Sequence, residues 1–291
     1  MTARRLDDVR LEIAEISRFQ LPDAFTGQFS IVTPTFNSEL TLARTLESVS
    51  VARDVLGEEV EHIVIDGGST DSTLDIVNDF ERKGSVSRWL SAPDRGIYHA
   101  MNRGLALASG SIVGIINSDD VLLPGALKAV AVAASLRPTA DVYHGNLQWY
   151  VDGVGTKPAP SRPSLNFSSD SMPVNHPATF VRRAAYERYG LFDEGFRLCA
   201  DRDLMLRLNE SGVEFHHVDE VLVRMQAGGA SANFGRVQEE IRAIMKSRNC
   251  RASERIRFEI LSLFRGAKHR LSSSSRKEIM LLRKLYRKAS W

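Results

Sequence analysis

The feature that most constrains the fold of this 291-residue chain is a series of short apolar runs, each followed by polar residues and then by a helical pattern. Short apolar runs that alternate with helical segments are typical of a layered α/β domain with a mainly parallel sheet. The fifth run is rich in Tyr and Trp, and its connection to the others is expected to make the sheet mixed. The expected strands are residues 29–32, 62–65, 86–90, 111–116 and 142–151.

Helical patterns separate and follow these runs. Leu6, Val9 and Ile13 recur at three- and four-residue spacing and predict an amphipathic helix over residues 6–19 that caps the domain. The Pro- and Ser-rich stretch 156–173 is too polar for a regular element and predicts a mobile loop. Loops of this length often close over sites. Further helices are expected around residues 42–49, 74–80, 96–108, 200–210 and 236–289, with a break at 272–275, together with a short helix that ends before Gly190. Further strands are expected at 178–181 and 215–223.

Charge divides the chain into unequal parts. Residues 236–291 hold 16 Lys and Arg against 5 Asp and Glu, although the net charge of the whole chain is only +2. We therefore expect three parts: an N-terminal helical cap (1–27), an α/β domain (28–235) and a basic helical C-terminal extension (236–291). The extension suits an anionic membrane surface or an ordinary solvated helical face. Aromatic residues are sparse among its charges, which disfavours nucleic acid as a partner.

Composition points to a cytoplasmic protein, and the basic extension suits peripheral attachment at the inner face of the cell membrane. No stretch approaches the roughly 20 consecutive apolar residues of a membrane-spanning helix, and the charged N-terminus lacks a hydrophobic signal core. Cys199 and Cys250 are too few for a disulfide framework and lack metal-site spacing, so both are expected to be reduced thiols.

Three polar clusters follow expected strands, at residues 33–37, 66–71 and 117–120. Ligands of open parallel sheets bind outside the carboxyl ends of the strands. The three clusters are therefore predicted to converge on one crevice.

Each cluster alone has an ordinary explanation. Residues 66–71 are typical of a strand-to-helix turn, and they lack the glycine spacing of nucleotide-binding loops. Asp119 and Asp120 are harder to explain as a solvated turn, because adjacent like charges repel unless a cation or solvent compensates them. Paired carboxylates suit Mg²⁺ or Mn²⁺.

Taken together and in order, five motifs resemble the family 2 inverting glycosyltransferases with the GT-A fold, especially those of bacterial surface-polysaccharide biosynthesis. The resemblance covers roughly residues 28–225. It implies a Rossmann-like, mostly parallel mixed sheet flanked by helices. The motifs are Ser-Ile-Val-Thr-Pro-Thr-Phe-Asn at 30–37, Ile-Asp-Gly-Gly-Ser-Thr-Asp at 65–71, Asp-Arg-Gly-Ile-Tyr-His-Ala-Met-Asn-Arg-Gly at 94–104, Asn-Ser-Asp-Asp at 117–120 and Ala-Asp-Arg-Asp-Leu-Met-Leu-Arg at 200–207.

The resemblance assigns roles to particular residues. Thr33, Pro34 and Asp66 resemble the part that holds the nucleoside of the donor. Asp119 and Asp120 resemble the family's metal-binding element, which implies Mn²⁺ or Mg²⁺ on the donor diphosphate, with one carboxylate also contacting the donor. The two cannot be told apart by alignment, because Asn117 stands where many relatives have Asp.

Asp201 matches the catalytic base of this family, which takes the proton of the acceptor hydroxyl. Its neighbour Asp203 would point elsewhere on a helix and is expected to pair with an arginine. His176 resembles a position on the acceptor side of the site, although an ordinary structural histidine is the alternative. His99 and Arg103 share a helical face that suits the acceptor and the donor phosphate respectively, or solvent.

Three residues depart from the family pattern. Gly67 stands where many relatives carry a second Asp that helps to recognise the base, His99 replaces a common Asp, and Ala200 replaces an acidic residue. None of these changes removes the expected base or metal carboxylates, so activity is still predicted.

The expected function is transfer of a sugar from a UDP-, GDP- or dTDP-sugar to a hydroxyl of a saccharide or lipid-linked saccharide, in polysaccharide or glycolipid biosynthesis. The alternatives are a sugar-nucleotide nucleotidyltransferase, which would need a Gly-rich basic loop after the first strand, a glycosidase, and an inactive carbohydrate-binding or scaffold protein.

Overall fold

The structure is a computed structural model that describes residues 4–17, 28–151, 155–161, 172–226 and 233–270. The chain divides into two compact units, one of residues 1–165 and 173–227 and one of residues 166–172 and 228–291. The three-part division expected at residues 27 and 235 stays a prediction.

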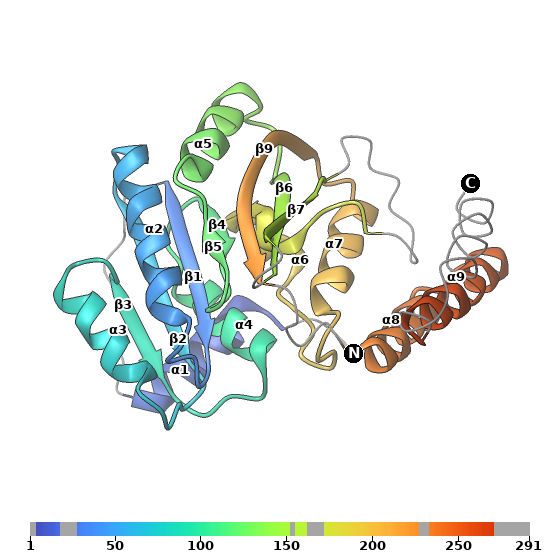
Figure 1. Ribbon diagram of the computed structural model, residues 1–291, viewed down its shortest axis with the longest axis horizontal. Coiled ribbons are helices and arrows are strands. Elements are labelled where there is room, and N and C mark those ends of the chain that lie inside the picture. The colour runs from blue at the N-terminus through green and yellow to red at the C-terminus, as the bar shows by residue number, and fades with distance from the viewer. Residues whose placement is uncertain (1–3, 18–27, 152–154, 162–171, 227–232, 271–291) are drawn as a thin grey trace. The chain divides into compact units, whose positions relative to one another are not determined.

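The first unit is built on one sheet, which has nine strands in the part of the chain that the structure describes (Figure 1). The strand order is β3-β2-β1-β4-β8-β6-β9-β5, and β7 pairs with β6. Parallel pairing joins β1 to β2 and β4, β2 to β3, and β6 to β9, whereas β8 is antiparallel to both β4 and β6. The predicted mixed sheet is therefore confirmed. The strands are β1 Phe29–Thr35, β2 Val60–Asp66, β3 Arg88–Ser91, β4 Ile112–Ile115, β5 Val121–Leu122, β6 Val142–Val151, β7 Gly155–Ala159, β8 Thr179–Arg182 and β9 Phe215–Gln226.

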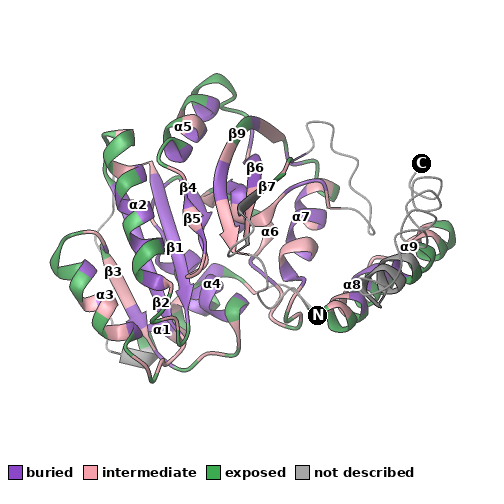
Figure 2. Ribbon diagram, in the orientation of Figure 1, coloured by how far each residue is buried: buried purple, intermediate pink, exposed green. Residues whose placement is uncertain are grey.

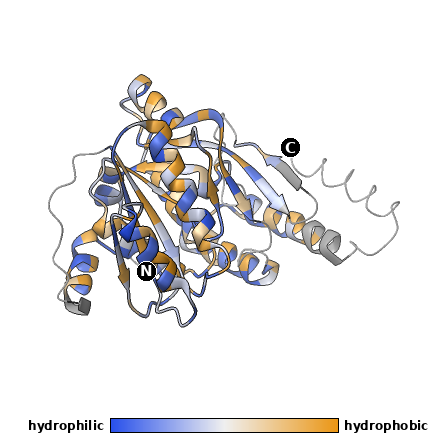
Figure 3. Cartoon of the chain, turned by 60° about the vertical axis from the view of Figure 1, so that its left-hand side comes forward, coloured by the Kyte–Doolittle hydropathy of each residue, from blue (hydrophilic) through white to orange (hydrophobic). Residues whose placement is uncertain are grey.

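Helices cover both faces of this sheet. Hydrophobic and hydrophilic residues form separate bands along the helices, as an amphipathic pattern requires (Figure 3). The first unit holds α1 Leu6–Ser17, α2 Leu42–Leu56, α3 Thr73–Arg82, α4 Ile97–Leu107, α5 Ala126–Leu136, the 3₁₀ helix η1 His176–Ala178, α6 Arg183–Tyr189 and α7 Ala200–Glu210.

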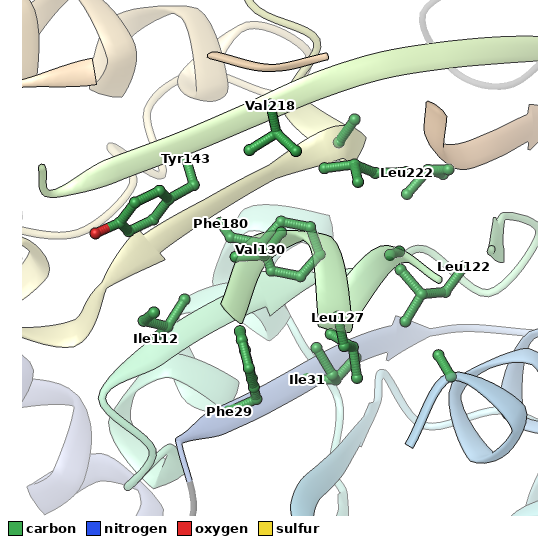
Figure 4. Packing of buried hydrophobic residues seen from close by; sticks show 14 of the residues in the cluster. Phe29, Ile31, Ile112, Leu122, Leu127, Val130, Tyr143, Phe180, Val218 and Leu222 are labelled. Atoms are coloured by element: carbon green, nitrogen blue, oxygen red, sulfur yellow. The ribbon is translucent and has the colours of Figure 1, made fainter. Parts of the chain in front are cut away.

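All seven residues of β1 are buried, because helices pack on both of its faces (Figure 2). Phe29 and Ile31 point to one face and join a cluster with residues of α5 such as Leu127 (Figure 4). Val32 points to the other face, where a β-carbon at Gly104 of α4 would lie only 2.2 Å from Val32 Cγ1. The glycine thus lets α4 approach the sheet closely.

The N-terminal helix α1 packs on α4. Its side chains Leu6, Val9 and Ile13 are buried, which confirms the predicted amphipathic helix. The described part of the helix runs to Ser17, and the last two residues of the predicted helix lie outside the described residues.

The prediction of a loop over residues 156–173 is wrong in its first part. The strand β7 occupies Gly155–Ala159 and pairs antiparallel with β6. An edge strand tolerates Pro158, which has no N–H to donate. The rest of that loop, 162–171, lies outside the described residues. The helix α5 and the two-residue strand β5 were not among the predicted elements.

The second unit contains α8 Phe234–Ser247 and α9 Ala252–Arg270. The predicted continuous helix is interrupted at residues 248–251, where Asn249 adopts a left-handed φ of 49°. The predicted break at 272–275 lies outside the described residues. Arg242 of α8 forms a two-pronged ion pair with Glu259 of α9, at 2.7 and 2.9 Å. Across the described ranges, every helix is too short or too polar to cross a membrane.

Candidate active site

The carboxyl ends of β1, β2 and β4 lie at one edge of the sheet, and hydrogen bonds join the polar residues that follow them. The backbone N–H of Asn37 donates to Ser69 Oγ at 2.8 Å, and the side chain of Asn37 accepts from the N–H of Thr70 at 2.9 Å. The hydroxyls of Ser38 and Ser118 lie 2.8 Å apart. The predicted convergence of the three polar clusters is confirmed by these contacts.

Several buried acceptor atoms at this edge have no hydrogen-bond partner within the described residues. An unpartnered buried polar atom costs about 1–3 kcal/mol, so its persistence at a sheet edge calls for a ligand. The atoms are Thr35 Oγ1, Asn117 Oδ1 and Asp120 Oδ1.

Asp119 and Asp120 follow β4 directly. Asp120 is fully buried, and its carboxylate accepts hydrogen bonds from the side-chain amide of Asn117, at 3.1 Å, and from the backbone N–H of Gln226. Burial and then the charge of Asp119 raise the pKa of Asp120 to about 7. Burial also raises the pKa of Asp119. Negative charge on this pair therefore needs compensation.

Helix α2 anchors the backbone of the same pair. Thr45 Oγ1 donates to the carbonyl oxygen of Asp120 at 2.7 Å, and Arg44 Nη2 donates to the carbonyl oxygen of Asp119 at 3.0 Å. The two aspartates are thus held in place by contacts that leave their carboxylates available.

The acidic pair fits a divalent cation that is shared with a ligand. Nowhere in the described ranges do three or more His, Cys, Asp or Glu side chains gather as a complete metal site. Mg²⁺ and Mn²⁺ usually take one or two carboxylates and complete their coordination with waters and substrate phosphates. Two adjacent carboxylates and the free Asn117 Oδ1 match that incomplete donor set.

The side chains of Thr33 and Asp66 have partners inside the protein. Thr33 Oγ1 lies 3.0 Å from His62 Nε2, and both residues are fully buried. The Asp66 carboxylate accepts from the backbone N–H groups of Gly68 and Ser69, each at 2.9 Å, and from the hydroxyls of Ser69 and Ser91. The donor contacts expected of Thr33 and Asp66 stay predictions.

Pro34, the third residue expected to hold the nucleoside, lies within β1 opposite Ile65 of β2. It is buried and one position before Thr35, whose hydroxyl is unpartnered. Its donor contact also stays a prediction.

Asp201 lies in the first turn of α7 and is held by a residue of α4. The hydroxyl of Tyr98 donates to Asp201 Oδ1 at 3.1 Å, and the ring of Tyr98 stacks on Phe192 with centroids 5.5 Å apart. Burial and the negative charge of Asp201 raise the pKa of Tyr98 well above its usual value, so the tyrosine stays a donor. Asp203 instead pairs with Arg207 at 3.4 Å, as predicted.

His176 begins the 3₁₀ helix η1 and packs edge-on against Phe192, at 5.6 Å between ring centroids. Burial lowers its pKa, whereas the charge of Asp201 opposes that shift. Since β8 runs antiparallel to β4 and follows η1 directly, η1 lies near the carboxyl end of β4. His176 and Asp201 therefore lie at the same edge of the sheet as the carboxyl end of β4, which leads to Asp119.

His99 and Arg103 contact a carboxylate of the protein itself. Glu12 of α1 binds His99 Nε2 at 2.6 Å, Arg103 Nη2 at 3.2 Å and Arg4 Nη2 at 2.8 Å. Burial would raise the pKa of Glu12, but hydrogen bonds from Arg4 and His99 lower it to about 2. Both His99 and Arg103 are buried, so the alternative of a solvated helix face is wrong. Their contacts with acceptor and donor remain predictions.

The family model for "Glycosyl transferase family 2" matches residues 30–197, more than half of the chain. This chain belongs to glycosyl transferase family 2. A "PGL/p-HBAD biosynthesis glycosyltransferase" of Mycobacterium bovis is 33% identical over 181 residues, which are 62% of this chain and 68% of that protein.

Solved structures establish the GT-A fold of this glycosyltransferase. A mannosyltransferase of Pyrobaculum calidifontis, in complex with GDP-Man and Mn²⁺, superimposes with a TM-score of 0.62 at 17% identity, over 98% of this chain and 89% of that one. S. aureus TarS 1–349, in complex with UDP, gives a TM-score of 0.58 at 20% identity, over 86% and 73%. In another crystal structure of S. aureus TarS, this chain covers 44% of the matched chain. The predicted fold is therefore confirmed.

Two residues of this glycosyltransferase at the same sheet edge were not predicted as site residues. The ring of Phe36, directly after β1, is 59% exposed. The carboxylate of Asp94, in the loop before α4, lies against Gly67. Both stand within motifs that carry the resemblance, but their proximity to Gly67 depends on how three loops pack. Tyr98 was missed for the same reason, because it is 103 positions from Asp201.

Proposed function

We propose that this chain is an inverting, metal-dependent glycosyltransferase that moves a sugar from a nucleotide-sugar donor to an acceptor hydroxyl. The observation that carries the proposal is the Asp119–Asp120 pair at the end of β4, in which Asp120 is buried and has an unpartnered carboxylate oxygen. Such a pair requires positive charge. The family and the fold favour a cation bound to the donor diphosphate as the source of this positive charge.

The donor would lie across the ends of β1, β2 and β4. Asp119 and Asp120 would hold Mn²⁺ or Mg²⁺, and a bound cation would stabilise the charge of the departing diphosphate. Thr33, Pro34 and Asp66 would shape the nucleoside end through the backbone around them. Two structural neighbours, one in complex with UDP and one in complex with GDP-Man and Mn²⁺, support this class of ligand.

Asp201 would act as the base. Its Oδ1 accepts the hydroxyl of Tyr98, and its Oδ2 has no hydrogen-bond partner in the described part of the chain. This oxygen would take the proton of the acceptor hydroxyl as that oxygen attacks the anomeric carbon. Attack from the face opposite the leaving diphosphate inverts the configuration. His176, whose charge state is coupled to Asp201, would line the acceptor side.

The proposal is tested by nucleotide release from a panel of UDP-, GDP- and dTDP-sugars with Mn²⁺ or Mg²⁺ and saccharide acceptors. Asp201→Asn should lower kcat by about 100-fold or more, the usual value of general base catalysis, without weakening nucleotide binding. Asp203→Asn is the matched control, because Asp203 lies in the same helix but pairs with Arg207.

A chain that binds no nucleotide in the presence of either metal would contradict the proposal. So would equal rates for Asp201→Asn and the native chain, or conversion of the nucleotide-sugar, with added pyrophosphate, to a nucleoside triphosphate and a sugar 1-phosphate. The last outcome would indicate a nucleotidyltransferase.

We also propose that the acceptor is a saccharide or lipid-linked saccharide, presented at the inner face of the cell membrane. The similarity to a mycobacterial protein named for PGL/p-HBAD biosynthesis supports a glycolipid or polysaccharide pathway. The basic C-terminal extension would attach to anionic lipid, at about 1 kcal/mol for each engaged Lys or Arg. The helix α9 adds exposed apolar residues at four- and three-residue spacing, namely Ile256, Ile260 and Leu263.

Vesicle sedimentation tests the membrane proposal. The full chain should sediment with phosphatidylglycerol vesicles at low salt and much less with phosphatidylcholine vesicles. Replacement of Ile256, Ile260 and Leu263 by Ser should reduce binding, whereas Leu136→Ser, at an exposed apolar residue of α5, should not. Equal binding to both lipids that is insensitive to salt would contradict an electrostatic attachment.

A further inference from the structure

Glu12 is the acid through which α1 contacts α4. Its Oε1 accepts hydrogen bonds from His99 Nε2 at 2.6 Å and from Arg103 Nη2 at 3.2 Å. Its Oε2 accepts from Arg4 Nη2 at 2.8 Å and from Arg95 Nη2 at 3.5 Å. One carboxylate therefore joins α1 to α4 and to the loop that precedes α4.

The bonds of His99 define which of its nitrogens carries a proton. The backbone N–H of Arg95 donates to Nδ1 at 3.1 Å, so this nitrogen is an acceptor. The ring is therefore neutral, and its proton is on Nε2, which donates it to Glu12. Burial, followed by the charge of Arg103, lowers the pKa of His99, in agreement with a neutral ring. His99 thus connects Glu12 to the backbone of the loop before α4.

Arg103 connects Glu12 to the same loop from the next turn of α4. Its Nη1 donates to the carbonyl oxygens of Ala92 and Pro93, at 3.1 and 3.2 Å. Arg103 is 3% exposed, and a buried cation that loses its carboxylate partner is strongly destabilised. The position of Arg103 therefore depends on the charge of Glu12.

A second carboxylate extends this connection to the segment that leads to α7. Glu194 Oε1 accepts from Arg4 at 3.1 Å, and Glu194 Oε2 accepts from Arg95 at 2.8 Å. The two arginines that bind Glu194 are thus the two that bind Glu12 Oε2. Asp201 lies in the first turn of α7, directly after this segment.

Tyr98 stands beside His99 in the first turn of α4 and contacts the proposed base. Its hydroxyl donates to Asp201 Oδ1 at 3.1 Å. A contact longer than about 3.5 Å is no longer a hydrogen bond, so a small displacement of this turn would release Asp201. The residues that fix the first turn of α4 therefore bear on the orientation of the base.

We propose that Glu12 is a positioning residue for glycosyl transfer, because it fixes the first turn of α4 and thereby keeps the hydroxyl of Tyr98 on Asp201. This inference rests on the proposed function. The match to the family model begins at residue 30, so Glu12 lies outside the segment that defines the family. The N-terminal helix is accordingly a working part of the enzyme.

Steady-state kinetics of Glu12→Gln test the inference, in the full chain and with the donor and metal that give the fastest transfer by the native protein. The amide keeps the length of the side chain but replaces one oxygen by an N–H₂ group, so it cannot accept from both His99 and Arg4. We expect kcat to fall by about 10-fold, since a misplaced base slows the chemical step. The Kd of the nucleoside diphosphate should change by less than about 2-fold.

The matched control is Asp7→Asn, which also removes one carboxylate from α1. Asp7 is exposed and pairs with Arg10 of the same helix, so kcat should be unchanged. The buried side chains Leu6, Val9 and Ile13 remain in both variants and keep α1 on the domain.

A double variant separates positioning from loss of stability. Tyr98→Phe removes the hydroxyl through which Glu12 is inferred to act. The kcat of Glu12→Gln combined with Tyr98→Phe should therefore be close to that of Tyr98→Phe alone. If Glu12 contributed only to stability, the two losses would multiply, and kcat would be about 10-fold lower again.

Three results would overturn the inference: an unchanged kcat in Glu12→Gln, a loss confined to nucleotide affinity, or losses that multiply in the double variant. Each of them leaves glycosyl transfer by the native chain intact. A native chain that transfers no sugar from any donor would instead refute the proposed function, and this inference with it.

Discussion

Tyr98 links the helix α4 to the proposed base by a single hydroxyl. Removing that hydroxyl in Tyr98→Phe leaves the ring stacked on Phe192 but frees Asp201 Oδ1. We expect kcat to fall by about 10-fold, because one hydrogen bond to a charged group is lost, with little change in nucleotide affinity. Steady-state kinetics with donor titration separate the two quantities. A rise in KM for the donor at constant kcat would contradict the positioning role.

His62 makes stability depend on pH. Complete burial lowers the pKa of His62 from its ordinary 6.5 to about 4. Between these values the unfolded chain binds a proton that the folded chain excludes, so stability is full above about pH 6.5 and falls as the pH drops toward 4. The loss is on the order of 3 kcal/mol.

Urea unfolding at pH 7 and pH 4.5 checks this expectation. His62→Gln keeps a polar side chain next to Thr33 but has no titration in this range, so its stability should depend less on pH. The same pH dependence in both proteins would show that His62 is not responsible.

At the scale of elements, the contact between α4 and β1 depends on a residue without a side chain. Gly104→Ala should destabilise the fold by about 1–3 kcal/mol, because the added methyl would overlap Val32. Gly235→Ala is the control, because Gly235 is an exposed glycine of α8 with open space around it. Its substitution should not lower stability. Urea denaturation of both variants gives the comparison. Equal stabilities would mean that α4 shifts without cost.

Elements whose pattern is local were predictable, and those that depend on tertiary pairing were not. The strands β1, β2 and β4 are apolar enough to be buried on both faces, and their positions also predicted where the polar clusters meet. The strand β5 has only two residues, and β7 contains Pro158, so neither carries a strand pattern of its own.

The same limit applies to the candidate site. The aspartates at the end of β4 could be predicted as site residues, because adjacent like charges repel and adjacency can be read from the sequence. The partners of Asp66, the contact of His99 with Glu12 and the approach of Asp94 to Gly67 join residues that are far apart in sequence or in different loops. No spacing rule predicts such contacts, because they follow from how loops pack.

At the scale of the whole molecule, metal and nucleotide binding should depend on one another. The described part of the chain offers only two adjacent carboxylates for a cation, so the diphosphate must supply further ligands. Mn²⁺ alone should barely change Tm, whereas Mn²⁺ with UDP at 100 times its Kd should stabilise the protein by about 2.7 kcal/mol. Thermal unfolding with each ligand alone and with both measures this. A large shift from Mn²⁺ alone would indicate a complete metal site.

The contacts of Glu12 join parts of the chain that are synthesised at different times. Its helix emerges from the ribosome before two of the side chains that bind Glu12, since His99 is 87 positions later and Arg103 is 91 positions later. At about 5–20 residues per second, α1 spends at least several seconds without its docking surface. During that interval Leu6, Val9 and Ile13 have no α4 to cover them, so the nascent protein offers chaperones an apolar segment that the finished enzyme hides.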